Sequence, residues 1–508
     1  MLHCTNEKDY NLTFCAIDLI DKYAKSIIIY LAKKHKKEAH MSTNIRRSVN
    51  ATDLTIGDPL KVILLFTIPL LLSNFFQQVY NLTDTTIIGH ALGDDALSAI
   101  GSVSTINSVF MSLAFGLTNG FGVVLSKCYG ASDEKGLKEA VANSIVLAVI
   151  CSIVMSGVAT IFLKPLMNLL DVPKGEIYDM AHSFISILMI FMPINYFYNT
   201  AASFLRAIGD SKTPLYILIF STIINVGLDL LFVAVWDFGL PGAAIATVLS
   251  QTISFIVTLL FIIFKVPELR VGREHFTFDP KLLWNLFTTG MSFALMFTIV
   301  NIGSFILYSA INGFGKTTIA AHTTARKIVE FCFMSVTNLS SAMATFASQN
   351  HGAKKHDRVV EGLKKSILAS FVLCTLMIII IYAFGSNLTA ALSGSENPTV
   401  LSLSVKYLRF NLPFFYALSI LCVTRTTMQG LGSKIAPLIC SFMELLCKVF
   451  CALYLSKRLG YNGIIVCEPM SWVICAIFIM VVFFTNKNIR ATLAQAKSAK
   501  KQNNHAIN

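Results

Sequence analysis

Two aspartates lie in stretches of this sequence that are otherwise apolar enough to cross a lipid bilayer. Asp84 follows the apolar run that begins near Lys61, and Asp229 lies about 15 residues after Pro214, where another run begins. A charged side chain at the bilayer centre costs about 2.5–3.5 kcal/mol on insertion scales, so each aspartate needs a function or a partner. Two carboxylates that share a dry site repel each other and favour holding a proton between them. They equally offer oxygen ligands for a hard cation.

Polar residues accompany both aspartates at helical spacing. Asn74, Gln77 and Asn81 precede Asp84 at intervals of three or four residues, which places them on one helical face. Asn225 lies four residues before Asp229 and shares its face, and Thr247 lies at a comparable depth in the next apolar run. Such a face can also be a polar seam that holds helices together. A seam does not require a carboxylate, so we expect a cation-coupling site formed by Asp84, Asn225, Asp229 and Thr247.

The second half of the chain distributes its charges differently. Ile306 and Ala452 stand where Asp84 and Asp229 would repeat. Its charged residues within apolar runs are Glu330, Glu444, Glu468, Arg326, Lys327, Arg425 and Lys448. These residues either pair with one another, or Glu330 and Glu444 attract a cationic compound. Pro69, fifteen residues before Asp84, removes one helical hydrogen bond and is a candidate hinge.

The composition determines the class of protein that carries these residues. Of 508 residues, 55% are apolar and 14% are charged, against roughly 25% charged in soluble domains. A spanning helix needs about 20 apolar residues, and the runs lack the alternation of barrel strands. We therefore predict an all-α membrane protein with twelve transmembrane helices. They lie near residues 61–83, 97–124, 140–163, 179–205, 214–236, 240–264, 284–311, 318–346, 364–385, 400–424, 437–456 and 463–485.

The chain also repeats itself. Ser126, Gly130 and Ala131 recur as Ser348, Gly352 and Ala353, and other glycine and proline positions recur with the same offset of 222 or 223 residues. Six spans separate the copies, so the two halves have the same orientation, and a cavity is expected where they meet. The predicted parts are a cytoplasmic extension (1–52), a six-helix bundle (53–265), a linker (266–283), a second pseudo-symmetric six-helix bundle (284–486) and a cytoplasmic tail (487–508).

Charge in the loops predicts the orientation. With a cytoplasmic N-terminus, sixteen Lys and Arg residues fall in inner loops and five in outer loops, so both termini are expected in the cytoplasm. The same distribution of basic residues accounts for the net charge of +13, so we do not expect nucleic acid as a partner. Met41 is a more typical first residue for a protein of this kind than Met1. This favours translation that starts at Met41 and residues 1–40 that are dispensable. No catalytic motif appears in a plausible context, and no cofactor or enzymatic activity is expected.

Three linked motifs resemble the multidrug and toxic compound extrusion (MATE) family, across about residues 55–485. They are the stretch from Pro69 to Gly89, the loop from Arg206 to Pro214, and the stretch from Asn225 to Asp229. The resemblance implies a MATE-type pair of bundles that alternates between inward- and outward-open states. It also implies antiport, in which cationic drugs leave as H⁺ or Na⁺ enters. The family's first-bundle cation site implies the same roles for Asp84, Asn225, Asp229 and Thr247, which would be the Na⁺ ligands if Na⁺ is the coupling ion.

These inferences predict a plasma-membrane antiporter, monomeric, that exports cationic or amphipathic toxic compounds in exchange for H⁺ or Na⁺. The candidate residues of the substrate cavity are Gln77, Tyr80, Asn81, Asn195, Asn199, Glu330 and Glu444. A flippase for a lipid-linked saccharide is the nearest alternative, although the acids argue against the basic cavity it would need. A passive channel or a membrane enzyme is the more distant alternative. The sequence leaves open both the substrate and the choice between H⁺ and Na⁺.

Overall fold

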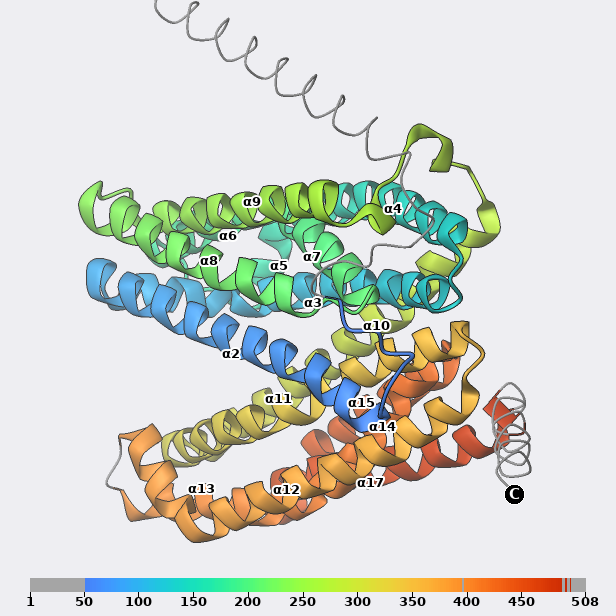
Figure 1. Cartoon of the computed structure of the whole chain (residues 1–508). Helices are drawn as coiled ribbons and strands as arrows, with labels where there is room; N and C mark the ends of the chain where they lie inside the picture. The colour runs from blue at the N-terminus through green and yellow to red at the C-terminus, as the bar shows by residue number, and fades with distance from the viewer. Residues whose placement is uncertain (1–50, 395–396, 487–488, 491–493, 495–508) are drawn as a thin grey trace, which may run out of the picture. The chain divides into compact units, whose positions relative to one another are not determined.

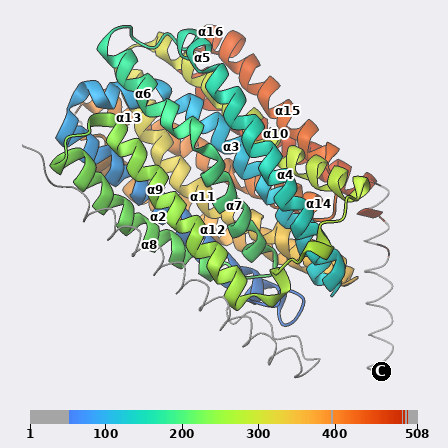
Figure 2. The same cartoon turned by 90° about the horizontal axis from the view of Figure 1, so that it is seen from above.

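A computed structural model describes residues 51–394, 397–486, 489–490 and 494, and helices are the regular structure in these ranges. The predicted extension before residue 51 and most of the predicted tail lie outside the described residues. Figures 1 and 2 show the helices from two directions. The helices of the first half are α2 (Pro59–Leu92), α3 (Asp94–Gly130), α4 (Glu134–Ile161), α5 (Leu163–Leu169), α6 (Glu176–Ile190), α7 (Met192–Ala207), α8 (Lys212–Asp229), η1 (Leu230–Val235) and α9 (Gly239–Lys265).

Two short 3₁₀ turns, η2 (Pro267–Leu269) and η3 (Arg273–His275), lie in the predicted linker. The second half contains α10 (Pro280–Ile311), η4 (Asn312–Phe314), α11 (Lys316–Gly352), α12 (His356–Ser393), α13 (Pro398–Asn411), η5 (Leu412–Phe414), α14 (Phe415–Gly430), α15 (Ile435–Phe450), η6 (Cys451–Leu455), α16 (Ser456–Leu459) and α17 (Tyr461–Thr485). Each half thus presents its long helices in the same order.

Ten helical segments among the described residues are long and apolar enough to cross a membrane. An eleventh span is formed if α6 and α7 count together, although the two are bent by 46° at the junction, where Pro193 lies in the first turn of α7. The remaining predicted span corresponds to α11, which is 37 residues long but more polar than the others. Arg326, Lys327 and Glu330 are among its polar residues, so its membrane-crossing character cannot be recognised from hydropathy alone.

The backbone repeats as the sequence does. Positive φ angles, which L-residues other than glycine rarely adopt, recur at positions 221–223 residues apart. The pairs are Gly93 and Gly315, Ser132 and Lys354, Asp171 and Gly394, Gly209 and Gly432, and Gly239 and Gly460. These residues lie at the corners between helices, so the two halves turn at equivalent places.

The packing of α2 and α10 joins the two halves. Val62, Ile63 and Phe66 at the start of α2 belong to the hydrophobic core formed mainly by α11, α12, α14 and α17, whereas Ile88 near its end belongs to the first half's core. In the same way, Leu286 at the start of α10 packs in the first half's core. Figure 1 shows α2 passing from α11 and α12 to α8. Each half therefore buries the beginning of one helix from the other half.

The halves also touch through two equivalent glycines at the helix ends that the sequence predicts to be cytoplasmic. A Cβ added at Gly130 would lie 1.9 Å from the carbonyl oxygen of Gln349, and one added at Gly352 would lie 2.0 Å from that of Lys127. Only glycine permits such close backbone approach. The end of α3 is thereby held against the end of α11.

The segment Thr52–Asp58, which we call the clasp, connects both halves at this same end. The Thr52 backbone amide donates to the Gly209 carbonyl at 3.0 Å in the first half. The second half donates to clasp carbonyls from the side chains of Asn350 (to Leu54, 3.0 Å), Lys355 (to Thr55, 2.8 Å) and Arg358 (to Gly57, 2.6 Å). Lys365 pairs with Asp58, and its hydrogen bond holds the pKa of that carboxyl below its usual range. The clasp thus holds the two halves together at this end.

Candidate functional site

The two aspartates found from the sequence lie together in the structure. Asp84 is in the last third of α2, and Asp229 is the last residue of α8, the helix that packs along α2. Their carboxyl groups are near enough to interact directly. Asp229 is fully buried and Asp84 is half-buried. A pair of carboxylates in such surroundings cannot both be charged cheaply without a cation or a proton between them.

Asn225 and Thr247, the other predicted members, belong to the same region. Asn225 is fully buried one turn before Asp229 and interacts with its side chain. Thr247 on α9 accepts a hydrogen bond from the Tyr80 hydroxyl at 3.3 Å. Tyr80 also experiences the charges of Asp84 and Asp229. The sequence analysis placed Tyr80 only in the substrate cavity, whereas the structure places it beside the carboxylate pair.

Buried polar atoms without a hydrogen-bond partner mark this region. One oxygen of Asp84, both oxygens of Asp229, and the side-chain oxygen and nitrogen of Asn225 lack a partner among the described residues. Buried polar groups are nearly always satisfied in folded proteins, so the cluster has capacity to bind something further. Carboxylate, amide and hydroxyl oxygens suit Na⁺, and the carboxylate pair suits H⁺. Among the described residues, this site included, no group of three or more His, Cys, Asp or Glu side chains could hold a metal ion.

A π-helical segment follows Asp229 directly. In η1, which spans Leu230–Val235, the backbone is wider than in an α-helix, and such segments occur frequently at functional sites. The second half has a π-helix, η6, at the corresponding place. There Ala452 replaces Asp229 and Lys448 replaces Asn225, because both positions are 223 residues further along the chain. The π-helical segment is therefore present in both halves, but the carboxylate that precedes it is present only in the first half.

The second half instead contains a network of buried ion pairs. Glu444, 5% exposed, lies 3.3 Å from the Lys448 ammonium and 3.7 Å from the Arg425 guanidinium. Glu468 accepts hydrogen bonds from Arg326 and, at 3.2 Å, from Tyr407. Among the predicted cavity residues, Glu444 is therefore enclosed by cations of its own bundle rather than presented to a cargo.

The other predicted cavity residues are more accessible. Gln77 and Asn81 are exposed on α2, and Glu330 on α11 is 55% exposed while paired with Arg326 at 3.3 Å. Asn195 and Asn199 on α7 are half-buried and are joined by a hydrogen bond of 2.9 Å. Pro69, the candidate hinge, is buried within an unbroken α2, at the level where this helix passes from one core to the other.

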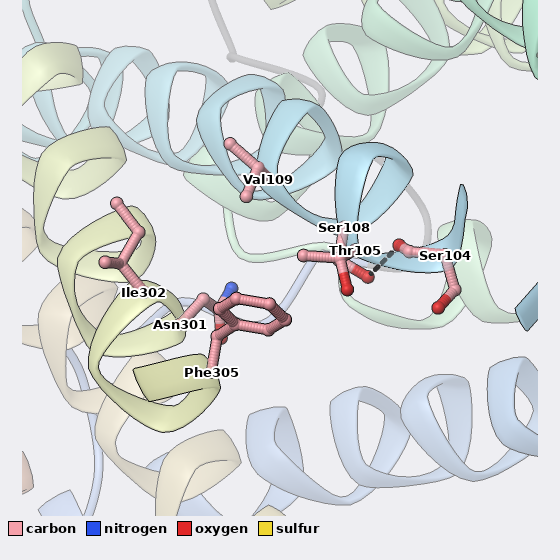
Figure 3. Close-up of a pocket in the computed structure, with 7 residues that line it drawn as sticks. All are labelled: Ser104, Thr105, Ser108, Val109, Asn301, Ile302 and Phe305. Atoms are coloured by element: carbon pink, nitrogen blue, oxygen red, sulfur yellow. Dashed lines mark hydrogen bonds between the residues drawn. The ribbon is translucent and has the colours of Figure 1, made fainter. Parts of the chain in front are cut away.

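A pocket that the sequence analysis missed lies between α3 and α10, which belong to different halves. It has a volume of about 230 Å³ and is lined by Ser104, Thr105, Ser108, Val109, Asn301, Ile302 and Phe305. Figure 3 shows Asn301 and Phe305 of α10 facing the α3 residues. Asn301 also donates to Ser112 of α3 at 2.6 Å. The repeated serine spacing on α3 was the available signal, but neutral hydroxyls attract little notice beside buried acids.

This fold and site define a class of protein. It is a helical membrane protein with two like-oriented repeats, and the first repeat contains two neighbouring carboxylates without a basic partner in the described part of the chain. The family model MatE matches residues 69–231 and 293–454, one segment in each half. The chain belongs to the MATE family, a family of membrane transporters.

Known relatives agree with this assignment. The chain is 28% identical to "Probable multidrug resistance protein YoeA" of Bacillus subtilis over 388 residues, which cover 75% of this chain and 83% of the relative. It is 24% identical to the "FAD transporter" of Shewanella oneidensis, over 81% of this chain and 91% of that one. A solved structure described as the outward-facing conformation of a multidrug resistance MATE family transporter shares its fold, with a TM-score of 0.79 and 21% identity over 90% of this chain. The predicted all-helical MATE-type fold is confirmed.

Proposed function

We propose that this protein is a secondary antiporter that exports cationic or amphipathic organic compounds in exchange for H⁺ or Na⁺. The observation that carries the proposal is the Asp84–Asp229 pair, whose buried oxygens lack partners among the described residues. Relatives named as multidrug resistance proteins support the export of organic compounds. The saccharide flippase alternative draws no support from the relatives and is not proposed.

The proposed mechanism is exchange through a shared conformational equilibrium. Asp84 lies on α2 and Asp229 lies on α8, so an ion between them strengthens the contact of these helices on the outer side. The clasp and the glycine contacts close the opposite end in the described conformation. An ion drives cargo outward only to the extent that its affinity differs between the two open states. A bound ion therefore favours the state with low cargo affinity.

The topology follows from the same proposal. We place the protein in the plasma membrane, as a monomer, with both termini in the cytoplasm, which the distribution of basic loops supports. The two bundles are proposed to extend over residues 53–265 and 284–486, with 266–283 as the linker. The clasp end is then the cytoplasmic end.

The test is dye efflux from proteoliposomes under separately imposed pH and Na⁺ gradients. Asp84→Asn and Asp229→Asn remove the ionisable groups while nearly preserving shape, so each should abolish gradient-driven transport without preventing membrane insertion. Asp237→Asn is a matched control, because Asp237 is exposed between η1 and α9. Full gradient-dependent efflux by both site variants, or efflux from the wild type that ignores both gradients, contradicts the proposal.

A further inference from the structure

Lys327 on α11 is a charged residue that the structure leaves without a partner among the described residues. Its side chain is exposed, eleven residues from the start of the helix, which is roughly 16 Å along the axis at 1.5 Å per residue. Several other cations on the second half's helices have partners, and Lys406 and Arg409 on α13 contact Asn462 and Tyr382. Arg326, Arg425 and Lys448 are all paired with Glu330, Glu444 or Glu468. No hydrogen bond or ion pair of Lys327 is seen among the described residues.

The helical phase of α11 shows where this charge points. Asn338 lies eleven residues after Lys327, which returns to the same face after three turns. Asn338 accepts a hydrogen bond of 2.7 Å from Asn74 on α2, so this face of α11 is directed at the first half. Phe331, one turn from Lys327, lies on the same face and is 60% exposed. Lys327 and Phe331 therefore face the space beside α2, on the outer side of the Asn74–Asn338 contact.

The internal repeat relates this face of α11 to the α3 pocket. An offset of 222 residues aligns Ser104, Thr105, Ser108 and Val109 of the α3 pocket with Arg326, Lys327, Glu330 and Phe331 of α11. This stretch belongs to α11, which packs against α2 as α3 packs against α10. None of the seven residues that line the α3 pocket is ionisable. The equivalent stretch of α11 carries a positive charge and an aromatic ring, and the neighbouring α2 exposes the amides of Gln78 and Asn81.

A structural role for Lys327 does not fit its surroundings. Glu330 is held by Arg326, and Arg326 is anchored by Glu468. Lysines near helix ends extend toward the membrane surface, but Lys327 lies three turns inside α11. An ammonium that faces an inter-bundle space retains three donors for a ligand.

We propose that Lys327 binds an anionic group of the cargo, so that the transported compounds are amphipathic molecules with a carboxylate, sulfonate or phosphate beside an aromatic body. This inference rests on the proposed function and narrows its substrate class. Phe331 packs against the aromatic body, and Gln78 and Asn81 donate hydrogen bonds from the opposite side. Glu330, held by Arg326, tolerates a cationic group nearby but does not require one.

The test compares two xanthene dyes of similar size, cationic rhodamine 123 and anionic fluorescein, in proteoliposomes under the gradient that drives the wild type. Lys327→Gln should raise the KM for fluorescein by about tenfold or more, because a charge-assisted hydrogen bond is lost. The KM for rhodamine 123 should stay within twofold or fall, and Lys327→Glu should favour rhodamine 123 further. Lys316→Gln changes an exposed lysine at the start of the same helix and should alter neither value.

The outcomes separate this inference from the proposed function. Gradient-driven transport of rhodamine 123 without transport of fluorescein would overturn the inference and leave the antiporter proposal intact. An equal loss for both dyes in Lys327→Gln would assign Lys327 a structural role and also overturn it. Fluorescein transport that depends on Lys327 but not on any imposed ion gradient would support the site and contradict antiport.

Discussion

Tyr80 on α2 lies where this helix meets α8 and α9. From α2 it donates to Thr247 on α9, and it lies near Asp229 at the end of α8. A half-buried phenol of this kind can orient the neighbouring oxygens without itself changing charge. We therefore propose that Tyr80 positions the carboxylate pair and does not carry the ion.

Tyr80→Phe removes only this hydroxyl. We expect the driving-ion concentration for half-maximal transport to rise by about fivefold, since one such hydrogen bond contributes about 1 kcal/mol. The measurement is initial transport rate against pH or Na⁺ concentration. Tyr216→Phe, which changes an exposed tyrosine on α8, should leave the curve unchanged. If Tyr80→Phe leaves the curve unchanged, Tyr80 does not contribute to ion binding.

Among the helices, α2 is the best candidate to couple the proposed ion site to the second half of the protein. Its beginning is buried in the second half's core, and its last third carries Tyr80 and Asp84 alongside α8. Pro69 lies between these two parts and cannot donate the backbone hydrogen bond that its position would otherwise supply. A helix fixed at both ends bends most readily where that bond is absent.

Pro69→Ala restores the missing donor to the Leu65 carbonyl. We expect the thermal midpoint in detergent to be unchanged or higher, while the maximal transport rate falls because α2 bends less readily. Pro59→Ala provides the control, since Pro59 lies in the first turn of the same helix, where no hydrogen bond is lost. Equal effects of the two changes on transport would argue against a hinge at Pro69.

At the scale of the whole described chain, the clasp is the contact that both halves share most directly. Arg358 on α12 donates to the Gly57 carbonyl at 2.6 Å and the Leu54 carbonyl at 3.3 Å, and it lies over the Phe346 ring. A guanidinium can make these contacts together because its donors form a rigid fork. The clasp must release these carbonyls if the halves are to separate at this end.

Arg358→Ala should weaken closure of the clasp end. We expect the loss of roughly 1.5–3 kcal/mol of charge-assisted hydrogen bonding to lower the thermal midpoint in detergent. Arg458→Ala removes an exposed arginine that lies over the Tyr454 ring after η6 and serves as the comparison. A midpoint that falls no further for Arg358→Ala than for Arg458→Ala would show that the clasp does not stabilise this conformation.

Much of this molecule could be predicted from its sequence, because apolar length and internal repetition are local signals. The pairing of Asp84 with Asp229 remained a prediction until α2 and α8 could be placed side by side, since sequence spacing does not determine contacts between helices. For the same reason, the sequence left open whether Glu444 pairs with cations of its own half or attracts a cationic compound, and the structure shows it paired with Lys448 and Arg425. The α3 pocket escaped notice because its hydroxyl groups are neutral and become a site only when α10 faces them.

The exchange of helix beginnings between α2 and α10 has a consequence for biosynthesis. When translation has completed only the first repeat, the start of α2 lacks the apolar surface it will finally cover, since that surface has not yet been made. Neither repeat can reach its mature packing alone. If the polypeptide were cut in the linker, the two fragments would have to associate to regain this packing. A single fragment would expose the unfilled apolar surface and would be degraded by membrane quality control.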